Sequence, residues 1–170
     1  KMTKLKLEQE LYNYMIKTEQ TLAVAESLTG GEISSRLTDI PGSSKYFLGG
    51  ICAYANEVKI NFLGVKAETI NNFGAVSEQC AKEMLKGILH QTDANWGIAT
   101  TGIAGPTGAT PKKPIGLVYI AVGTQDMFSC EAFYFSGTRL QIKNQAVIKA
   151  LEMLVHYFSG RKKLTFTELK

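Results

Sequence analysis

The sequence contains few cysteines and no long apolar run, and both shortages limit what the protein can be. Its three cysteines, Cys52, Cys80 and Cys130, form no CxxC pair. An odd number of scattered cysteines argues against a disulfide framework and against a zinc site. No apolar segment approaches the roughly 20 residues that a membrane-spanning helix needs, and the charged first residues lack the apolar core of a secretory signal. We therefore expect a cytoplasmic protein without a membrane partner.

Histidine is also scarce, which argues against several kinds of catalytic site. The only two histidines, His90 and His156, stand apart and belong to no metal-ligand motif. We therefore expect no metal site and no catalytic triad built on histidine. The net charge is +4, and the basic residues are dispersed except for the run 161–163. Nucleic-acid-binding proteins usually concentrate such residues on one stripe, so nucleic acid is not an expected partner.

The 170 residues have the length and composition of one globular domain. The sequence has no internal repeat and no low-complexity linker, so we predict a single domain over residues 1–160 and a loose, polar, basic tail over 161–170. Apolar strands and amphipathic helices alternate along most of the chain, which is typical of a sheet covered by helices on both faces. The predicted fold class is α/β, a three-layer α/β/α sandwich with a mixed, mostly parallel sheet.

Local signals predict where the helices and strands lie. The expected helices have apolar residues at helical spacing or a capping residue at their start, and the expected strands are short β-prone runs. We expect helices near 7–15, 29–38, 56–64, 77–88 and 138–158, and strands near 21–26, 46–55, 95–100, 117–123 and 130–135. The strand over 46–55 should be buried, with a bulge or a close backbone approach at Gly49 and Gly50. The last two strands should form an antiparallel hairpin.

The turn after the first strand is a candidate reactive site. Ser27 follows that strand, and ligands of open α/β sheets bind beyond the carboxyl ends of strands. Thr29 and Glu32 have the spacing of a capping box. The N–H groups of Gly30 and Gly31 would lie in the first helical turn, where an oxyanion or a phosphate can be held. The residues alone leave two interpretations open: a nucleophile beside an anion site, or simply a capped helix start.

Lys59 is a candidate general base. It falls three residues after Asn56, the expected cap of a short helix. That position lies near the positive end of the helix dipole, which disfavours the ammonium form. Burial would lower the pKa of Lys59 further, and a neutral lysine can activate a serine. An exposed lysine on a surface helix is the alternative that the sequence leaves open.

Two further features are suited to a polar ligand. A glycine-rich loop over 102–114 follows Thr101 at the end of a strand, but it lacks the spacing of a P-loop. A plain connecting loop is the alternative interpretation. Arg139 begins a helix after a second capping box at Thr138, and arginine is well suited to bidentate phosphate contact. A solvated residue at a helix end is the alternative there.

Seven short motifs resemble the C-terminal domain of the CinA competence/damage-inducible family. They occur in the family's order and extend over about residues 5 to 158, so together they are far more specific than any one of them. The motifs are Ala25-Glu26-Ser27-Leu28-Thr29-Gly30-Gly31, Thr38-Asp39-Ile40-Pro41-Gly42-Ser43-Ser44, Tyr54-Ala55-Asn56-Glu57-Val58-Lys59, Leu63-Gly64-Val65, Gly74-Ala75-Val76-Ser77-Glu78, Thr101-Gly102-Ile103-Ala104-Gly105-Pro106 and Lys113-Pro114-Ile115-Gly116-Leu117-Val118-Tyr119.

This resemblance implies an activity and a set of site residues. It implies an amidase that hydrolyses the carboxamide of nicotinamide mononucleotide to nicotinic acid mononucleotide and ammonia, without a cofactor. By position, Ser27 matches the nucleophile, Lys59 the general base, and Tyr54 a residue that organises the pair. The resemblance also implies a homodimer. The positions that it associates with the site and with holding the nucleotide are Ser44, Thr101 and Arg139. Together with these, we predict that Thr29, Gly30, Gly31, Asn56 and Gly102 bind the substrate.

Two positions depart from the family pattern. Leu28 stands where the family often has cysteine, so a thiol is not needed there, which favours Ser27 as the nucleophile. Thr138 stands where the family often has an acid, which leaves the orientation of Arg139 open. Larger relatives carry an additional N-terminal domain that we do not expect in a chain of this length. The alternative function is a non-catalytic nucleotide-binding or regulatory module, although such a module would not need both Ser27 and Lys59.

Overall fold

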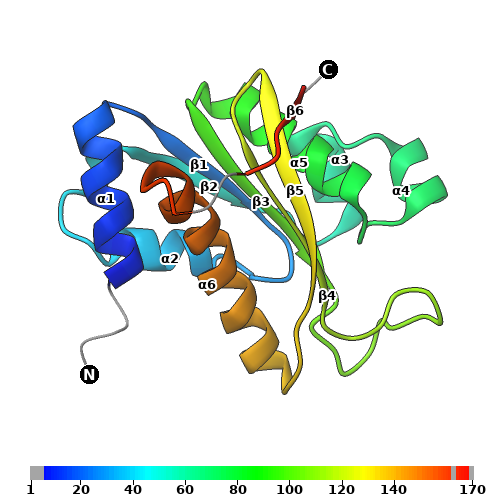
Figure 1. The fold of residues 1–170 in the computed structure, drawn as a ribbon. Helices are drawn as coiled ribbons and strands as arrows, with labels where there is room; N and C mark the ends of the chain where they lie inside the picture. Colours follow the sequence, from blue (N-terminus) through cyan, green and yellow to red (C-terminus); the bar gives the residue numbers. More distant parts are fainter. Residues whose placement is uncertain (1–5, 162–163, 169–170) are drawn as a thin grey trace.

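A six-stranded sheet forms the centre of the molecule (Figure 1). The computed structural model describes residues 6–161 and 164–168. The strands follow the spatial order β2-β1-β3-β4-β5-β6. They are β1 (Leu22–Glu26), β2 (Phe47–Cys52), β3 (Trp96–Gly102), β4 (Leu117–Gly123), β5 (Met127–Tyr134) and β6 (Thr167–Glu168). The helices are α1 (Lys6–Thr18), α2 (Glu32–Thr38), α3 (Asn56–Leu63), α4 (Ala67–Phe73), α5 (Glu78–Thr92) and α6 (Arg139–Phe158), with a 3-10 turn η1 (Ser43–Lys45) before β2.

Helices cover both faces of this sheet, which confirms the predicted three-layer sandwich. Helix α6 packs against β3 and β4 on one face, and α1 and α2 lie beside it. Helix α5 packs against the other face, and α3 and α4 lie against α5. The sheet presents small side chains to α5, which lets that helix lie close to the strands. These side chains are Ala23, Ala25, Ala99 and Ala121.

The sheet is mixed, as predicted, but it is not mostly parallel. Parallel pairing joins β1 to β2 and to β3, whereas β4, β5 and β6 are antiparallel to their neighbours. The expectation of a mostly parallel sheet is therefore wrong. The connection over residues 103–116 contains no helix that could carry the chain across the sheet, and parallel neighbours usually need such a crossover. The predicted hairpin of the two late strands is confirmed as β4 and β5.

Strands β1, β2 and β3 end at the same edge of the sheet. Glu26, the last residue of β1, pairs with Cys52 of β2 and with Thr100 of β3. Strand β2 lies at the side of the sheet and its residues alternate between partly buried and exposed, so the expectation of a buried strand was wrong. The register of β1 with β2 shifts just before Gly49, which confirms the predicted bulge.

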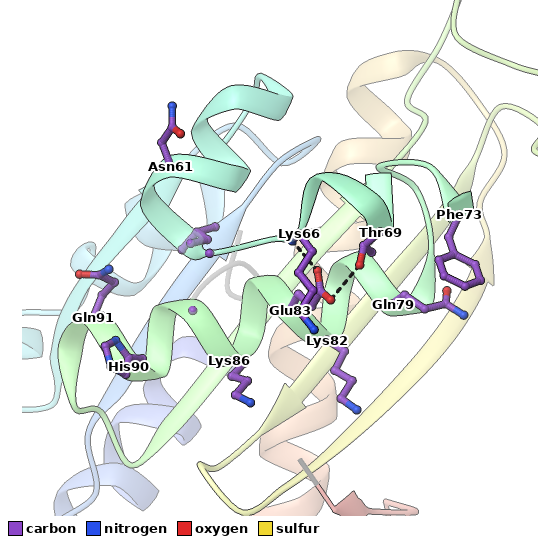
Figure 2. A pocket seen from close by; sticks show the side chains of 13 residues that line it. Asn61, Lys66, Thr69, Phe73, Gln79, Lys82, Glu83, Lys86, His90 and Gln91 are labelled. Carbon is purple, nitrogen blue, oxygen red and sulfur yellow. Dashed lines mark hydrogen bonds between the residues drawn. The ribbon is translucent and has the colours of Figure 1, made fainter. Parts of the chain in front are cut away.

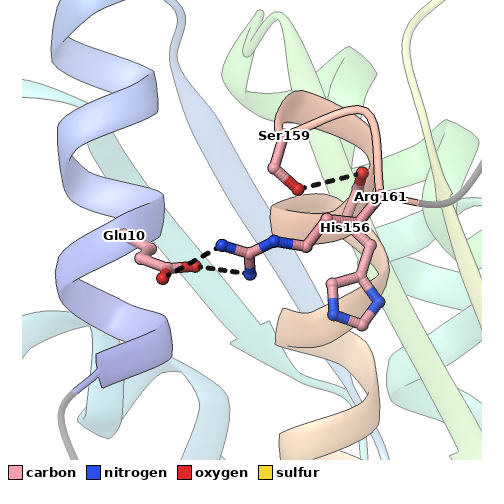
Figure 3. A network of polar contacts seen from close by, with 4 residues as sticks. All are labelled: Glu10, His156, Ser159 and Arg161. Carbon is pink, nitrogen blue, oxygen red and sulfur yellow. Dashed lines mark hydrogen bonds and ion pairs between the residues drawn. The ribbon is translucent and has the colours of Figure 1, made fainter.

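The described residues that follow α6 contact the rest of the domain. Arg161 pairs with Glu10 of α1 at 3.1 Å, and Figure 3 shows this guanidinium reaching from the end of α6 towards α1. Phe166 packs edge-on against Trp96, with ring centroids 6.2 Å apart, and β6 pairs with β5. The expectation of a loose tail is therefore wrong for residues 161 and 164–168. Its remaining residues lie outside the described part of the chain.

Candidate active site

A pocket of about 310 Å³ opens at the carboxyl ends of β1 and β3. Five segments form its wall: the turn after β1, the chain around the start of α3, residues 75–76, the glycine-rich loop and the start of α6. Most of the residues predicted for the site line this pocket. They are Ser27, Tyr54, Asn56, Lys59, Thr101, Gly102 and Arg139.

Ser27 is fixed by its backbone and leaves its hydroxyl to the pocket. Its N–H donates to the carbonyl of Thr100 at 3.0 Å, and its carbonyl accepts from the N–H of Gly30 at 3.0 Å. These two bonds tie the serine to β3 and close a tight turn. Within the described part of the chain, the Ser27 hydroxyl has no hydrogen-bond partner, so it is available to a ligand.

The capping box predicted at this turn does not form. Helix α2 begins at Glu32 after Gly31, which adopts a φ of 92° and has no side-chain cap. The Thr29 hydroxyl instead lies 2.9 Å from the Thr100 hydroxyl, in the interior. The carboxylate of Glu26 takes over the capping role from the end of β1. A Ser/Thr-x-x-Glu pattern was therefore not sufficient to identify the cap, because the acceptor comes from an earlier residue.

The N–H groups of both glycines in this turn are occupied. The Gly30 N–H donates to the Ser27 carbonyl at 3.0 Å, and the Gly31 N–H donates to Glu26 Oε2 at 3.1 Å. Neither group is free to face an oxyanion here, contrary to the expectation. Within the described residues, the N–H groups of Leu28 and Thr29 have no acceptor. Leu28 also lines the pocket directly after Ser27.

Lys59 is buried, with 2% of its surface exposed. Its Nζ donates to the carbonyl of Ala53 at 2.8 Å and to the carbonyl of Tyr54 at 3.1 Å. Burial lowers the pKa of Lys59 from its ordinary value of 10.5. No carboxylate pairs with this amine among the residues that the structure describes. The exposed-lysine alternative is therefore excluded.

Helix α3 starts one residue earlier than expected. Ala55 is its cap in an extended conformation, and Asn56 is the first helical residue rather than the capping side chain. The Lys59 N–H donates to the Ala55 carbonyl at 3.2 Å, so Lys59 follows the unpaired first turn. Asn56 is exposed and lines the pocket, which leaves its amide available to a ligand.

Arg139 bridges two walls of the pocket. Its guanidinium donates to the Gly105 carbonyl at 2.6 Å and to the Tyr54 hydroxyl at 2.6 Å. The predicted capping box at Thr138 is confirmed and starts α6 at this arginine. Tyr54 therefore meets Arg139 through its hydroxyl and Lys59 through its carbonyl. This arrangement connects the two basic side chains of the pocket, Arg139 and Lys59, through one residue.

The remaining predicted residues have mixed outcomes. The Thr101 hydroxyl donates to the Ala75 carbonyl at 2.7 Å, so it fixes the pocket wall. A Cβ on Gly102 would lie 2.7 Å from the Leu117 carbonyl, which only glycine allows. Ser44 does not line the pocket. It is exposed in η1, which precedes β2 and therefore lies at the opposite end of the strands.

A larger pocket of about 670 Å³ lies over α3, α4 and α5, away from Ser27 (Figure 2). Glu83 stands in it and accepts from the backbone N–H of Lys66 at 2.9 Å and from the Thr69 hydroxyl at 2.8 Å. These bonds fix the start of α4, as the dashed lines in Figure 2 show. The described residues that line this pocket include no nucleophile beside a buried base. We therefore place the chemistry in the smaller pocket.

Sequence reasoning missed Glu26 as a site residue, although it directly precedes Ser27. The described residues contain no cluster of three or more His, Cys, Asp or Glu able to hold a metal ion. Across the same ranges, none of the helices has the length and apolar character needed to cross a membrane.

Comparison with known proteins finds one consistent family. The model of the CinA C-terminal domain matches residues 4–158. A CinA-like protein of Endomicrobium trichonymphae is 47% identical over 140 residues, which are 82% of this chain and 33% of that protein. A CinA-like protein of Thermotoga neapolitana is 44% identical over 156 residues, which are 92% of this chain and 38% of that protein. The chain thus spans well under half the length of these curated relatives.

Solved structures match the whole domain. The competence damage-inducible protein A of Klebsiella pneumoniae is 31% identical with a TM-score of 0.89, over 94% of this chain and 99% of that chain. The competence/damage inducible protein of Agrobacterium tumefaciens is 38% identical with a TM-score of 0.85, over 89% of this chain and 93% of that chain.

Proposed function

Because this chain belongs to the CinA C-terminal domain family, we propose that it is an amidase that hydrolyses nicotinamide mononucleotide to nicotinic acid mononucleotide and ammonia. The choice of substrate rests on the family resemblance. The choice of reaction rests chiefly on one observation: a buried lysine shares a pocket with a serine hydroxyl, and neither has an ionic or hydrogen-bond partner in a side chain of the described residues. A module that only binds nucleotides has no need of that pair.

The surroundings of Lys59 favour a neutral amine whose lone pair is free. A neutral amine has two N–H bonds and one lone pair. The carbonyls of Ala53 and Tyr54 accept two hydrogen bonds from Nζ. The lone pair on Nζ then remains available to accept a proton from a group in the pocket. Since burial lowers the pKa of this lysine, it suits the role of a general base.

In the first half of the reaction, the Lys59 amine takes the proton of Ser27, and Ser27 Oγ attacks the carboxamide carbon. The two side chains share the pocket but no hydrogen bond joins them, and catalytic hydrogen bonds often form only when the substrate is bound. The Leu28 N–H, directly after the nucleophile, would face the oxyanion, as in other strand–turn–helix nucleophile sites. One such donor contributes about 3 kcal/mol to stabilising the transition state.

In the second half, the protonated Lys59 returns its proton to the departing nitrogen, and ammonia leaves. A water molecule then attacks the acyl-enzyme ester, with Lys59 accepting its proton. The C–O bond to Ser27 breaks, the serine regains a proton from Lys59, and the acid product is released. Every proton that moves passes between Lys59 and a group in the pocket, so no metal is required.

Arg139 would hold the phosphate end of the nucleotide. Its guanidinium has donors beyond the two that contact Gly105 and Tyr54, and guanidinium groups bind phosphate strongly. Tyr54 is 60% exposed at the same place, which leaves its ring surface available to the substrate. We also propose that the active species is a homodimer, which light scattering of the purified chain would test.

The test is ammonia release from nicotinamide mononucleotide, run beside several other amides. We expect the wild-type chain to release ammonia, and Ser27→Ala and Lys59→Ala to abolish the release while remaining folded. Lys86→Ala, which changes an exposed lysine of α5, is the matched control and should remain active. Near-normal turnover in either site variant would refute the Ser–Lys pair. Binding of the nucleotide without ammonia release would instead favour the non-catalytic module.

A further inference from the structure

The carboxylate of Glu26 is buried and accepts hydrogen bonds on both of its oxygens. Only 1% of the residue is exposed. Oε2 accepts from the N–H groups of Gly31 at 3.1 Å and Ile33 at 3.0 Å. Oε1 accepts from the N–H of Ser34 at 2.9 Å and from the Ser34 hydroxyl at 2.8 Å. A buried charge satisfied in this way stabilises the groups that surround it.

Through these bonds, the Glu26 carboxylate occupies the position at the start of α2 where an external anion could bind. The first N–H groups of a helix have no partner within the helix, and α2 has no side-chain cap at Gly31. Glu26 supplies the missing acceptors from the end of β1. An external anion is therefore kept away from this position, and the turn between the strand and the helix is held at both ends.

The backbone of Glu26 also connects the nucleophile to the general base. Its carbonyl accepts from the Ala53 N–H at 2.8 Å. The Ala53 carbonyl accepts from Lys59 Nζ at 2.8 Å. Ser27 follows Glu26 directly, and its N–H donates to Thr100 at 3.0 Å. A shift of Glu26 would thus move the serine relative to the segment that holds the lysine amine.

We infer that Glu26 is a positioning residue, whose carboxylate fixes the start of α2 and so sets Ser27 Oγ against Lys59 Nζ. Its effect on the rate rests on the proposed amidase function. Its effect on the backbone does not, because the hydrogen bonds to Gly31, Ile33 and Ser34 exist whatever the protein does. These two effects allow a failure of the inference to be told apart from a failure of the proposed function.

The direct test is Glu26→Gln, which keeps the size of the side chain but turns one acceptor oxygen into a donor that faces N–H groups. We expect kcat for nicotinamide mononucleotide to fall by about 100-fold, as when a reacting group is misplaced by about 1 Å, with a much smaller change in KM. The amides of Gly31, Ile33 and Ser34 should exchange hydrogen faster than in the wild type, as measured by NMR.

Glu8→Gln is the matched control. Glu8 is fully buried and pairs with Arg36 of the same helix α2, but it does not contact the Ser27 turn. We expect this variant to lose stability and to keep its kcat. Ser34→Ala, which removes one of the four bonds to Glu26, should fold readily and give a smaller fall in kcat in the same direction.

The outcomes separate the inference from the proposed function. Unchanged kcat in both Glu26→Gln and Ser34→Ala would overturn the inference, as would an equal fall in Glu8→Gln, since the effect would then follow stability alone. If the wild type released no ammonia, the proposed function would fail. The faster exchange of the three amides in Glu26→Gln would still support the positioning role, and unchanged exchange would refute it.

Discussion

The close contact between α3 and α5 allows one prediction with a magnitude. Gly87 lies on α5 where the last residue of α3 crosses it. A Cβ on Gly87 would lie 1.9 Å from the Leu63 carbonyl oxygen and 2.6 Å from its carbon. Both are backbone atoms, so no side-chain rotation relieves the overlap. Gly87→Ala must therefore push the end of α3 away by about 1.5 Å to reach ordinary contact, a displacement of the kind that core overpacking produces.

Two opposing effects set the stability of Gly87→Ala. Overpacking of this kind costs about 1 to 3 kcal/mol, and alanine in place of glycine within a helix returns about 1 kcal/mol. The expected net loss of about 1 kcal/mol corresponds to a fall in Tm of about 2 to 4 °C for a domain of this length. Since Lys59 lies one turn before Leu63 on α3, the displacement should also lower kcat, by about 100-fold at 1 Å.

Thermal unfolding and ammonia release, each compared with wild type, check these two numbers. Lys86→Ala, at the exposed neighbouring position of α5, serves as the control. It should change neither Tm nor kcat by much. A higher Tm with full activity in Gly87→Ala would refute the reasoning, because it would mean that the gain in helix propensity meets no opposing contact.

Two further predictions follow from the charges of the pocket. Because burial lowers the pKa of Lys59 below 10.5, kcat/KM should rise with pH as this amine loses its proton. At pH values between the lowered pKa and 10.5, Lys59 carries the proton in the unfolded chain but not in the folded one, so the free energy of unfolding should also rise with pH. Lys59→Met should remove this pH dependence, as measured by chemical unfolding. Arg139→Lys cannot bridge Gly105 and Tyr54, and its KM should rise about tenfold or more in steady-state assays; an unchanged KM would exclude the phosphate contact.

The features that the sequence predicted correctly depend on neighbours along the chain. The Thr138 capping box forms because its acceptor and donor are three residues apart. The Ser77 cap of α5 forms for the same reason, and the β4–β5 hairpin follows from two apolar runs and a short turn. In each case the competing conformations are also local, so the pattern of residue types suffices to decide between them.

The features that the sequence did not predict depend on contacts with residues that are distant along the chain. The capping box at Thr29 does not form because the Glu32 N–H donates to the Thr29 carbonyl and the Thr29 hydroxyl lies beside the Thr100 hydroxyl. The Glu26 carboxylate accepts from neighbouring amides instead. Ser44 belongs to a motif of the family resemblance, yet it lies at the far end of the strands. Which end of a strand a loop joins depends on the topology of the sheet, and no residue in the motif carries that information.

Two ionisable side chains beside the Ser27 turn have opposite surroundings. The Glu26 carboxylate accepts four hydrogen bonds from α2 and its start, which makes it a fixed part of the turn. Within the described residues, Lys59 Nζ donates to two carbonyl oxygens and pairs with no carboxylate. An ammonium there would be buried without an opposite charge, so its proton is held weakly. Had Glu26 faced Lys59 instead of α2, an ion pair would have raised the pKa of the lysine. Because Glu26 caps α2 instead, its carboxylate does not oppose the fall in the pKa of Lys59 that burial causes.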